Sequence, residues 1–458
     1  MAVRQISRCD KSGKLLLSSD KIEKSAQIPD NDPEMPSPAV GSSRPRLFHV
    51  LGPGLITGAS DDDPSGIATY SQVGAQFAYS LSWTLLVTYP LMVAIQTISA
   101  RIGRTTGHGL AGVLRLHCPK WLVTSVILLL LVANIINLGA DLGAMADALY
   151  LLFPAPRVLY VLLFASISIS MQLFLQYTRY VAVLKWLTLA LFAYFAALAY
   201  VHVDWHTLAW HMVWPDHALT PDYLTALVAI LGTTISPYLF FWQASQEVED
   251  MHVHPRRVRL IDAPSQGKDA LRRINIDTLV GMGFSNLVAL AILITTAATL
   301  NVRGIIDIQT SAQAAEALRP IAGNFASLIF TLGIIGTGLL AVPVLAGSAA
   351  YAVGEARQWP TGLKRRPKEA QAFYATLVIS TLVGMILNFV PIDPIKALFW
   401  SAVLNGVAAV PVMVIIMFVS ARKDIMGDFI IQGWLKGLGW AATLLMAGVV
   451  VAMLGAFL

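Results

Sequence analysis

The stretch GPGLITGASDDDPSGIATYSQVGAQF, from Gly52 to Phe77, places three consecutive aspartates, Asp61 to Asp63, inside an otherwise apolar segment. If this segment crosses a membrane, insertion scales assign roughly 2.5–3.5 kcal/mol to each ionised residue at the helix centre. Three such residues facing lipid would cost about 7–10 kcal/mol, more than one short span readily offsets. We therefore expect the aspartates to face water, a cation or both.

The composition of the whole chain is that of a polytopic membrane protein. Its 458 residues are 56% hydrophobic and 13% charged, whereas a soluble protein of this size carries about 25% charged residues. The net charge of +5 does not indicate a nucleic-acid partner, because the basic residues lie in loops between apolar runs. The two cysteines, Cys9 and Cys118, give neither a disulfide framework nor a metal motif.

Eleven apolar stretches are candidate spans, since about 20 residues cross the hydrocarbon core of a bilayer. They lie near residues 47–77, 81–101, 122–149, 157–175, 180–201, 221–247, 276–300, 322–350, 372–391, 395–419 and 435–457. Residues 1–45 are polar and lack the apolar core of a signal peptide, so we expect a disordered cytoplasmic tail. The polar segment 202–222 is expected to be an extracytoplasmic loop.

The distribution of Lys and Arg among the loops predicts the orientation of the chain. Basic residues cluster in the loops after spans 2, 6 and 8, whereas the segment from His202 to Asp222 contains neither Lys nor Arg. The even-numbered spans are therefore expected to end in the cytoplasm. The N-terminus would then be cytoplasmic and the C-terminus extracytoplasmic, in a plasma membrane (the inner membrane of a bacterium).

Pro64 and Pro237 interrupt spans 1 and 6 at corresponding places, five spans apart. This pattern indicates an inverted repeat, with spans 1–5 in residues 46–201, spans 6–10 in residues 223–420, and an eleventh span in residues 421–458. In such folds two discontinuous helices meet at the bilayer midplane and form the substrate site.

Each proline also changes the local hydrogen bonding. Proline has no N–H, so the carbonyl four residues earlier loses its helical partner; these carbonyls belong to Ser60 and Thr233. Bare carbonyl oxygens and carboxylates suit hard cations such as Mg²⁺, Mn²⁺ and Ca²⁺. An anionic substrate would instead require Arg, Lys or helix N-termini, and the interruptions contain neither Arg nor Lys.

The segment GPGLITGASDDDPSG, residues 52–66, resembles the first helix of the Nramp divalent-metal transporters, where the motif ends in Asp-Pro-Gly-Asn. Span 6, ILGTTISPYLFFWQAS, is similar to the family segment that contains Ala-Thr-Val-Met-Pro-His. The likeness covers roughly residues 46–457. It implies an all-α polytopic membrane protein of LeuT-like fold, with a 5+5 inverted repeat, an eleventh span and alternating access.

The resemblance carries the family's metal ligands over one at a time. The aspartate falls on Asp63 and is kept, the asparagine falls on Gly66, the backbone carbonyl on Thr233 and the methionine sulfur on Ser236. Loss of the thioether removes a preference for softer metals. Small residues should also widen the site for a partly hydrated Mg²⁺. The pattern looks like the Nramp-related magnesium transporter branch, which is expected to admit Mn²⁺ as well.

Other polar residues have more than one interpretation. Asp61 and Asp62 stand where the family has uncharged residues, and we expect them to add negative field and oxygen ligands. Asn405 on span 10 either supplies a further oxygen or forms a hydrogen bond between helices. Glu247, at the inner end of span 6, either lines a solvent path or belongs to a solvated helix end.

Proton-coupled Nramp members use an acidic pair on span 3 and a histidine after the span 6 proline. Here Asp141 is kept, but Ala144 falls on the second acid and Tyr238 falls on the histidine. Tyrosine does not titrate near neutral pH, so we expect little or no obligatory proton coupling. Asp141 and Tyr238 would line a solvent or proton path, although Asp141 could equally be a buried hydrogen-bonding partner.

The sequence therefore predicts a transporter of Mg²⁺, with Mn²⁺ as a second substrate, that needs the bilayer but no cofactor, nucleic acid or obligatory protein partner. The alternatives are a proton-coupled Mn²⁺/Fe²⁺ transporter of the ordinary Nramp type and an Al³⁺ transporter. A sodium-coupled amino acid transporter would place a substrate carboxylate against the aspartates. An enzyme is not expected, because no histidine lies in a broken span. A passive channel would differ in its ion flux.

Overall fold

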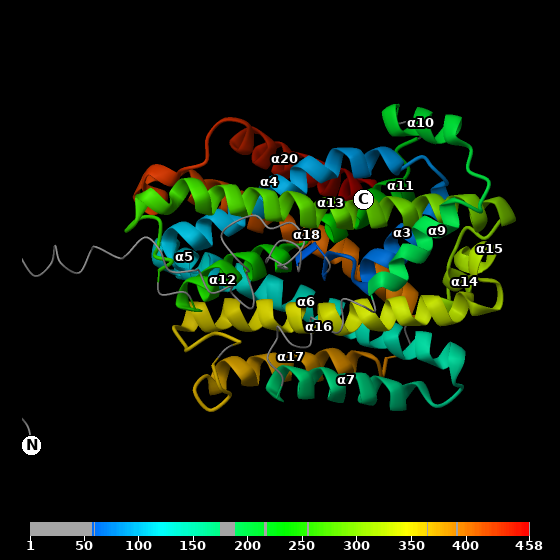
Figure 1. Ribbon diagram of the computed structural model, residues 1–458, viewed down its shortest axis with the longest axis horizontal. Helices are drawn as coiled ribbons and strands as arrows, with labels where there is room; N and C mark the ends of the chain where they lie inside the picture. Colours follow the sequence, from blue (N-terminus) through cyan, green and yellow to red (C-terminus); the bar gives the residue numbers. More distant parts are fainter. Residues whose placement is uncertain are drawn as a thin grey trace, which may run out of the picture. The chain divides into compact units, whose positions relative to one another are not determined.

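The structure is a computed structural model that describes residues 57–174 except 59, 188–214, 218–253, 256–363, 365–390 and 393–457. The predicted tail over residues 1–45, the beginning of span 1 and the first part of span 5, residues 180–187, lie outside these residues. Every regular element of the described part is helical, as expected for an all-α protein. Figure 1 shows the long helices running side by side.

The long helices are α4 (Ser82–Thr106), α6 (Lys120–Leu152), α7 (Arg157–Phe174), α13 (Gly267–Thr299), α16 (Ala326–Arg357), α17 (Gln371–Leu387), α18 (Pro394–Ala421) and α20 (Gly433–Ala456). Three shorter helices build the interrupted spans: α3 (Pro64–Phe77), α11 (Pro221–Thr234) and α12 (Pro237–Val253). The helix α9 (Phe192–Leu198) lies in predicted span 5, and the connections contain α5 (Leu110–His117), α10 (Trp205–Val213), α14 (Ser311–Ala315), α15 (Arg319–Ala322) and α19 (Lys423–Met426).

Nine of the predicted spans are recognisable in the described chain. Eight helical segments are long and apolar enough to cross a membrane, and they correspond to predicted spans 2, 3, 4, 6, 7, 8, 10 and 11. The shorter apolar helix α17 corresponds to span 9. Span 1 is represented by α3 and the turn before it, and the described end of span 5 contains α9.

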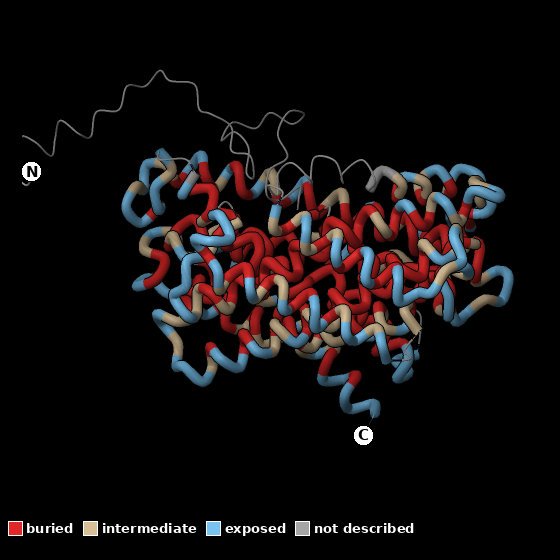
Figure 2. The backbone as a smooth tube through the Cα atoms, turned by 90° about the horizontal axis from the view of Figure 1, so that it is seen from below, coloured by how far each residue is buried: buried red, intermediate tan, exposed pale blue. Residues whose placement is uncertain are grey.

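The interrupted helices lie inside the bundle. The main contacts of α3 are with α13 and α18, and it also contacts α6 and α16, so it lies between α13 and the α6–α16 pair (Figure 1). The helix α11 packs along α18, and α12 packs along α4 and α16. Figure 2 shows buried backbone concentrated in the interior of this bundle and exposed backbone around its margin. An interrupted helix is tolerated at such depth because protein, not lipid, surrounds it.

Both predicted discontinuities are present. The helical turn that includes Ser60 ends before Asp63, whose backbone is extended (φ −69°, ψ 170°), and α3 starts at Pro64. The second interruption separates the end of α11 at Thr234 from the start of α12 at Pro237. Proline is well suited to the first helical position, because its missing N–H is not needed there.

One glycine lets two helices approach at backbone distance. A Cβ atom on Gly232 of α11 would lie 2.1 Å from the carbonyl oxygen of Ala402 and 2.5 Å from the amide nitrogen of Gly406, both on α18. Small residues allow such contacts between spans in a membrane, where close packing holds helices together. This contact fixes the end of α11 beside the second interruption.

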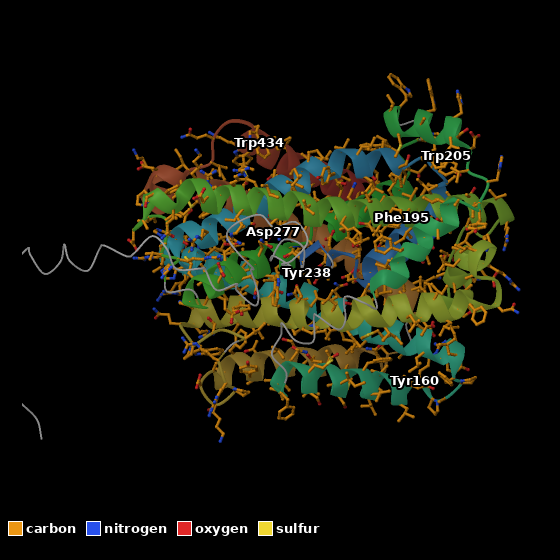
Figure 3. The ribbon with its side chains drawn as sticks, in the orientation of Figure 1. Tyr160, Phe195, Trp205, Tyr238, Asp277 and Trp434 are labelled. Carbon is orange, nitrogen blue, oxygen red and sulfur yellow. The ribbon has the colours of Figure 1, made fainter. Side chains whose placement is uncertain are left out.

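The predicted extracytoplasmic segment 202–222 contains the short helix α10, whose first amide groups are capped by Asp204. Leu208 is buried beneath this helix, while Trp205, Trp210 and Trp214 are 60%, 56% and 61% exposed. These tryptophans lie on the outside of the bundle, as Trp205 does in Figure 3.

Candidate metal site

Asp63 joins the two interruptions through its carboxylate. Its Oδ1 atom accepts hydrogen bonds from the Gly66 amide at 2.8 Å and the Ser65 hydroxyl at 2.6 Å, which caps the start of α3. Its Oδ2 atom accepts from Asn137 Nδ2 at 3.1 Å and from the Tyr238 hydroxyl at 3.4 Å. The side chain is buried, so these donors replace the water that an exposed carboxylate would bind.

Asn137 and Ser401 form a supporting pair that the sequence analysis missed. The Ser401 hydroxyl on α18 donates to Asn137 Oδ1 at 2.7 Å, which turns Nδ2 of this α6 amide toward Asp63. A buried amide in an apolar span, one helical turn before Asp141, is the signal that could have identified it. The pair connects α6 and α18 to the first interruption.

Asp61 and Asp62 point to a different helix. The Ser285 hydroxyl of α13 lies 2.7 Å from Asp61 Oδ2 and 3.0 Å from Asp62 Oδ1, and it has one proton to share between them. Their other oxygens have no hydrogen-bond partner among the described residues. The described part of the chain also contains no group of three His, Cys, Asp or Glu side chains that could hold a metal. The three aspartates therefore do not form one ligand cluster by themselves.

The two carbonyl groups freed by proline are not bare, which corrects the expectation from sequence. The Ser236 hydroxyl donates to the Thr233 carbonyl at 2.9 Å, and the Tyr238 hydroxyl donates to the Ser60 carbonyl at 3.3 Å. Buried backbone carbonyls are rarely left unpaired, and hydroxyls at the start of α12 satisfy both of these. A carbonyl oxygen has two lone pairs and can accept more than one contact.

At Gly66 the missing side chain allows close contact between the interruptions. A Cβ atom on Gly66 would lie 3.2 Å from Thr233 Oγ1, 3.3 Å from the Asp61 carbonyl oxygen and 3.5 Å from the ring of Tyr70. We expected this glycine to widen the site, but its neighbours already fill the space that a side chain would take. Its effect is to bring the backbone of α3 against Thr233.

Asp141 and Asn405 are buried polar residues near the Asp63 carboxylate. Asp141 lies one turn after Asn137 on α6, close enough to Asp63 for their charges to interact, and Asn405 lies one turn after Ser401 on α18. Neither side chain has a hydrogen-bond partner within the described ranges, although both are fully buried. The alternative of Asp141 as a hydrogen-bonded structural partner is therefore not supported, and both groups are available to an ion or its water shell.

The C-terminal end of α12, which the sequence predicts to be the inner end of span 6, is a buried ionic cluster, so its interpretation as a solvated helix end was wrong. Glu247 forms an ion pair with Arg273 of α13 at 2.5 Å, and the two side chains are 1% and 7% exposed. Glu249 accepts a hydrogen bond from the Tyr351 hydroxyl of α16 at 2.5 Å. Glu247 and Glu249 lie near a helix end, but α13 and α16 cover their carboxylates and supply an ion-pair partner and a hydrogen-bond donor.

The two helix interruptions meet where Tyr238 contacts Asp63, inside a bundle of apolar helices, and define a polytopic membrane protein of LeuT-like fold; Tyr238 marks their position in Figure 3. The sequence profile described as natural resistance-associated macrophage protein-like, Nramp, matches residues 54–456, and the chain belongs to this family. The family predicted from the two interrupted spans is thus confirmed.

Curated relatives are distant but extend over most of the chain. The divalent metal cation transporter MntH of Acidiphilium cryptum is 25% identical over 406 residues, which cover 86% of each protein. The MntH of Deinococcus radiodurans is 25% identical over 444 residues, 91% of this chain and 95% of its own. These relatives are named as transporters, in agreement with the prediction that the chain is not an enzyme.

A solved structure has the same fold. The crystal structure of the manganese transporter of Eremococcus coleocola is 18% identical, covers 91% of this chain and 96% of its own, and superposes with a TM-score of 0.70. At this identity the likeness supports the fold alone. The LeuT-like architecture expected from the resemblance is confirmed.

Proposed function

We propose that this chain transports divalent metal cations by alternating access, with the ion held at Asp63 between the two interruptions. The position of this buried carboxylate carries the proposal, because it contacts both α3 and α12 and lies beside the Ser60 carbonyl. The Thr233 carbonyl, the Ser236 hydroxyl and the buried side-chain oxygens of Asp61, Asp62 and Asn405 that lack a hydrogen-bond partner among the described residues are the further oxygen donors that we assign to the ion or its water shell.

Mn²⁺ is the substrate that the relatives favour, since they are named for divalent metal cations and the solved transporter for manganese. They support the ordinary Nramp alternative better than the magnesium branch. One feature of this chain favours Mg²⁺ as an additional substrate: Ser236 provides a hard oxygen where a family member has a thioether. A site made of oxygens alone also suits an ion that keeps several of its waters.

Replacing Asp63 by Asn tests the proposal. Asparagine can still cap α3 through its side-chain oxygen, so the variant should fold, but it lacks the negative charge that binds the metal. In proteoliposomes of the purified protein, Mn²⁺ uptake should fall to the background of empty vesicles. Mg²⁺ should compete with Mn²⁺ for uptake by the unmodified protein.

Asp424→Ala is the matched control, because this carboxylate is 57% exposed and pairs with Arg422 away from the interruptions. Its Mn²⁺ uptake should equal that of the unmodified protein. Normal uptake by Asp63→Asn would refute the proposed site. Mn²⁺ uptake without any competition from Mg²⁺ would refute the magnesium assignment and leave the manganese transporter.

We propose a plasma-membrane location with a cytoplasmic N-terminus and an extracytoplasmic C-terminus. The basic loop after α12, with Arg256, Arg257 and Arg259, supports this orientation, because short cytoplasmic loops are enriched in Lys and Arg. A reporter that is active on one side of the membrane, fused to the C-terminus, tests it.

A further inference from the structure

The Asp63 carboxylate has as many hydrogen-bond donors as it has lone pairs. Its oxygens accept from the Gly66 amide, the Ser65 hydroxyl, Asn137 and the Tyr238 hydroxyl. A carboxylate presents about four lone-pair sites. A cation that binds this carboxylate directly must therefore displace one of these donors.

The four donors are not held equally. The amide of Gly66 belongs to the backbone of α3, and the Ser65 hydroxyl lies two residues away at 2.6 Å. Asn137 is held from behind by Ser401, whose hydroxyl lies 2.7 Å from Asn137 Oδ1 and 2.7 Å from the Leu398 carbonyl. Asn137 Nδ2 lies closer to Asp63 than the Tyr238 hydroxyl does. The Tyr238 hydroxyl makes the longest contact, 3.4 Å, and divides its single proton between Asp63 and the Ser60 carbonyl at 3.3 Å. The donor that is lost with the least free energy is the tyrosine hydroxyl.

We propose that the Tyr238 hydroxyl is a placeholder for the metal ion. Its proton lies between Asp63 Oδ2 and the Ser60 carbonyl, the two oxygens of the first interruption that a cation would join. When the metal binds, the Tyr238 hydroxyl keeps its proton but loses its hydrogen bonds to both oxygens. These hydrogen bonds connect the start of α12 to the first interruption in the metal-free protein. This inference rests on the proposed function and assigns Tyr238 a role in setting the affinity of that same site.

The Tyr238→Phe variant should bind the metal ion more tightly than the unmodified protein, although the substitution removes a polar group from the site. Without the hydroxyl, the metal no longer competes with hydrogen bonds of the metal-free protein. One or two weak hydrogen bonds correspond to a dissociation constant about 3- to 10-fold lower. The hydrogen bonds that must break are the same whichever metal binds, so the dissociation constants for Mn²⁺ and Mg²⁺ should fall by the same factor.

The experiment is calorimetric titration of the purified full-length protein in detergent with Mn²⁺ and, separately, with Mg²⁺. Tyr160→Phe is the matched control, since it removes a tyrosine hydroxyl that donates to the Phe153 carbonyl at 2.7 Å at the margin of the bundle (Figure 3). Its dissociation constants should not change. Thermal denaturation of each variant identifies any variant that fails to fold.

The results separate this inference from the function on which it rests. If Asp63→Asn binds Mn²⁺ like the unmodified protein, the proposed site is wrong. If Asp63→Asn loses binding but Tyr238→Phe binds with an unchanged or higher dissociation constant, the placeholder is wrong and the site stands. A gain for one metal only would also overturn it.

A second measurement does not depend on a variant that lacks the hydroxyl. A fluorotyrosine incorporated at position 238 should change its fluorine resonance when Mg²⁺ is added to the metal-free protein. The resonance should change again when the bound Mg²⁺, which is diamagnetic, is replaced by saturating Mn²⁺. The change on addition of Mg²⁺ should disappear in the Asp63→Asn background. A resonance that stays constant at Mg²⁺ concentrations at which calorimetry shows the ion bound would overturn the proposal.

Discussion

At the scale of single residues, the site depends on side chains that orient other side chains. Asp63 was identified from the sequence because a carboxylate before a proline in an apolar segment has few structural explanations. Asn137 and Ser401 were not, because an amide or a hydroxyl in a span is commonly a bond between helices. Their role depends on how α3, α6 and α18 pack against one another, and the periodicity of a single helix does not predict this packing.

Asn137→Ala should weaken Mn²⁺ binding by about 10- to 100-fold, the usual effect of losing a group that orients a metal ligand. Without Asn137 the Oδ2 atom of Asp63 keeps only the long contact to Tyr238, so its position is less fixed while Ser65 and the Gly66 amide still hold Oδ1. Calorimetric titration with Mn²⁺ measures the change.

The control for this substitution is Asn134→Ala on the same helix. Asn134 donates to the Leu345 carbonyl and the Ser348 hydroxyl of α16, and none of these groups contacts Asp63. Its loss should lower stability and leave the dissociation constant unchanged. Equal weakening by both substitutions would show that Asn137 acts through the packing of α6 and not on Asp63.

At the scale of elements, the sequence predicted the interruptions well and the direction of their side chains poorly. Proline at positions 64 and 237 was enough to predict where α3 and α12 begin, since its missing N–H has a fixed consequence. The divergence of the aspartates was not predictable, because the helical turn ends between Asp61 and Asp63, so one helical periodicity does not relate their directions. Asp61 and Asp62 consequently face Ser285, whereas Asp63 faces Asn137.

The ionic cluster at the inner end of α12 gives a prediction about stability. Arg273→Met leaves Glu247 buried without its cationic partner, which should cost about 3–5 kcal/mol. The double variant Glu247→Gln/Arg273→Met should recover most of that loss, because no unpaired charge remains. Midpoints of thermal denaturation in detergent compare the three proteins.

A surface ion pair provides the comparison for this cluster. Arg422→Met disrupts the pair with Asp424, whose two side chains are 50% and 57% exposed. Because exposed ion pairs contribute about 0–1 kcal/mol, this substitution should change stability little. A similar small loss from Arg273→Met would show that α12 is not held in place by its charges.

At the scale of the whole molecule, the membrane class and the order of the spans followed from composition and hydropathy, because about 20 apolar residues have few uses other than crossing a bilayer. The buried charges at the inner end were not expected, since sequence alone does not reveal which neighbouring helix covers a helix terminus. The coupling of transport to protons is a property at this same scale, and it remains a prediction.

We predict that metal uptake proceeds without obligatory proton movement, because Tyr238 and Ala144 stand at two positions where proton-coupled members have titratable groups. Proteoliposomes that contain a pH-sensitive dye should show Mn²⁺ entry without acidification in step with it. The control is the same vesicles with an added proton ionophore, in which the rate of entry should not change. Acidification proportional to uptake would establish the proton-coupled alternative.

The contact at Gly232 has a consequence for how such a protein can alternate between its two faces. Because the α11 backbone packs directly against the backbone of Ala402 and Gly406, we expect α11 and α18 to resist sliding past each other. They should travel as a single rigid piece. The change in angle should then occur at the short non-helical segment of Ile235 and Ser236, so that α12 rotates relative to α11 and α18 about this hinge.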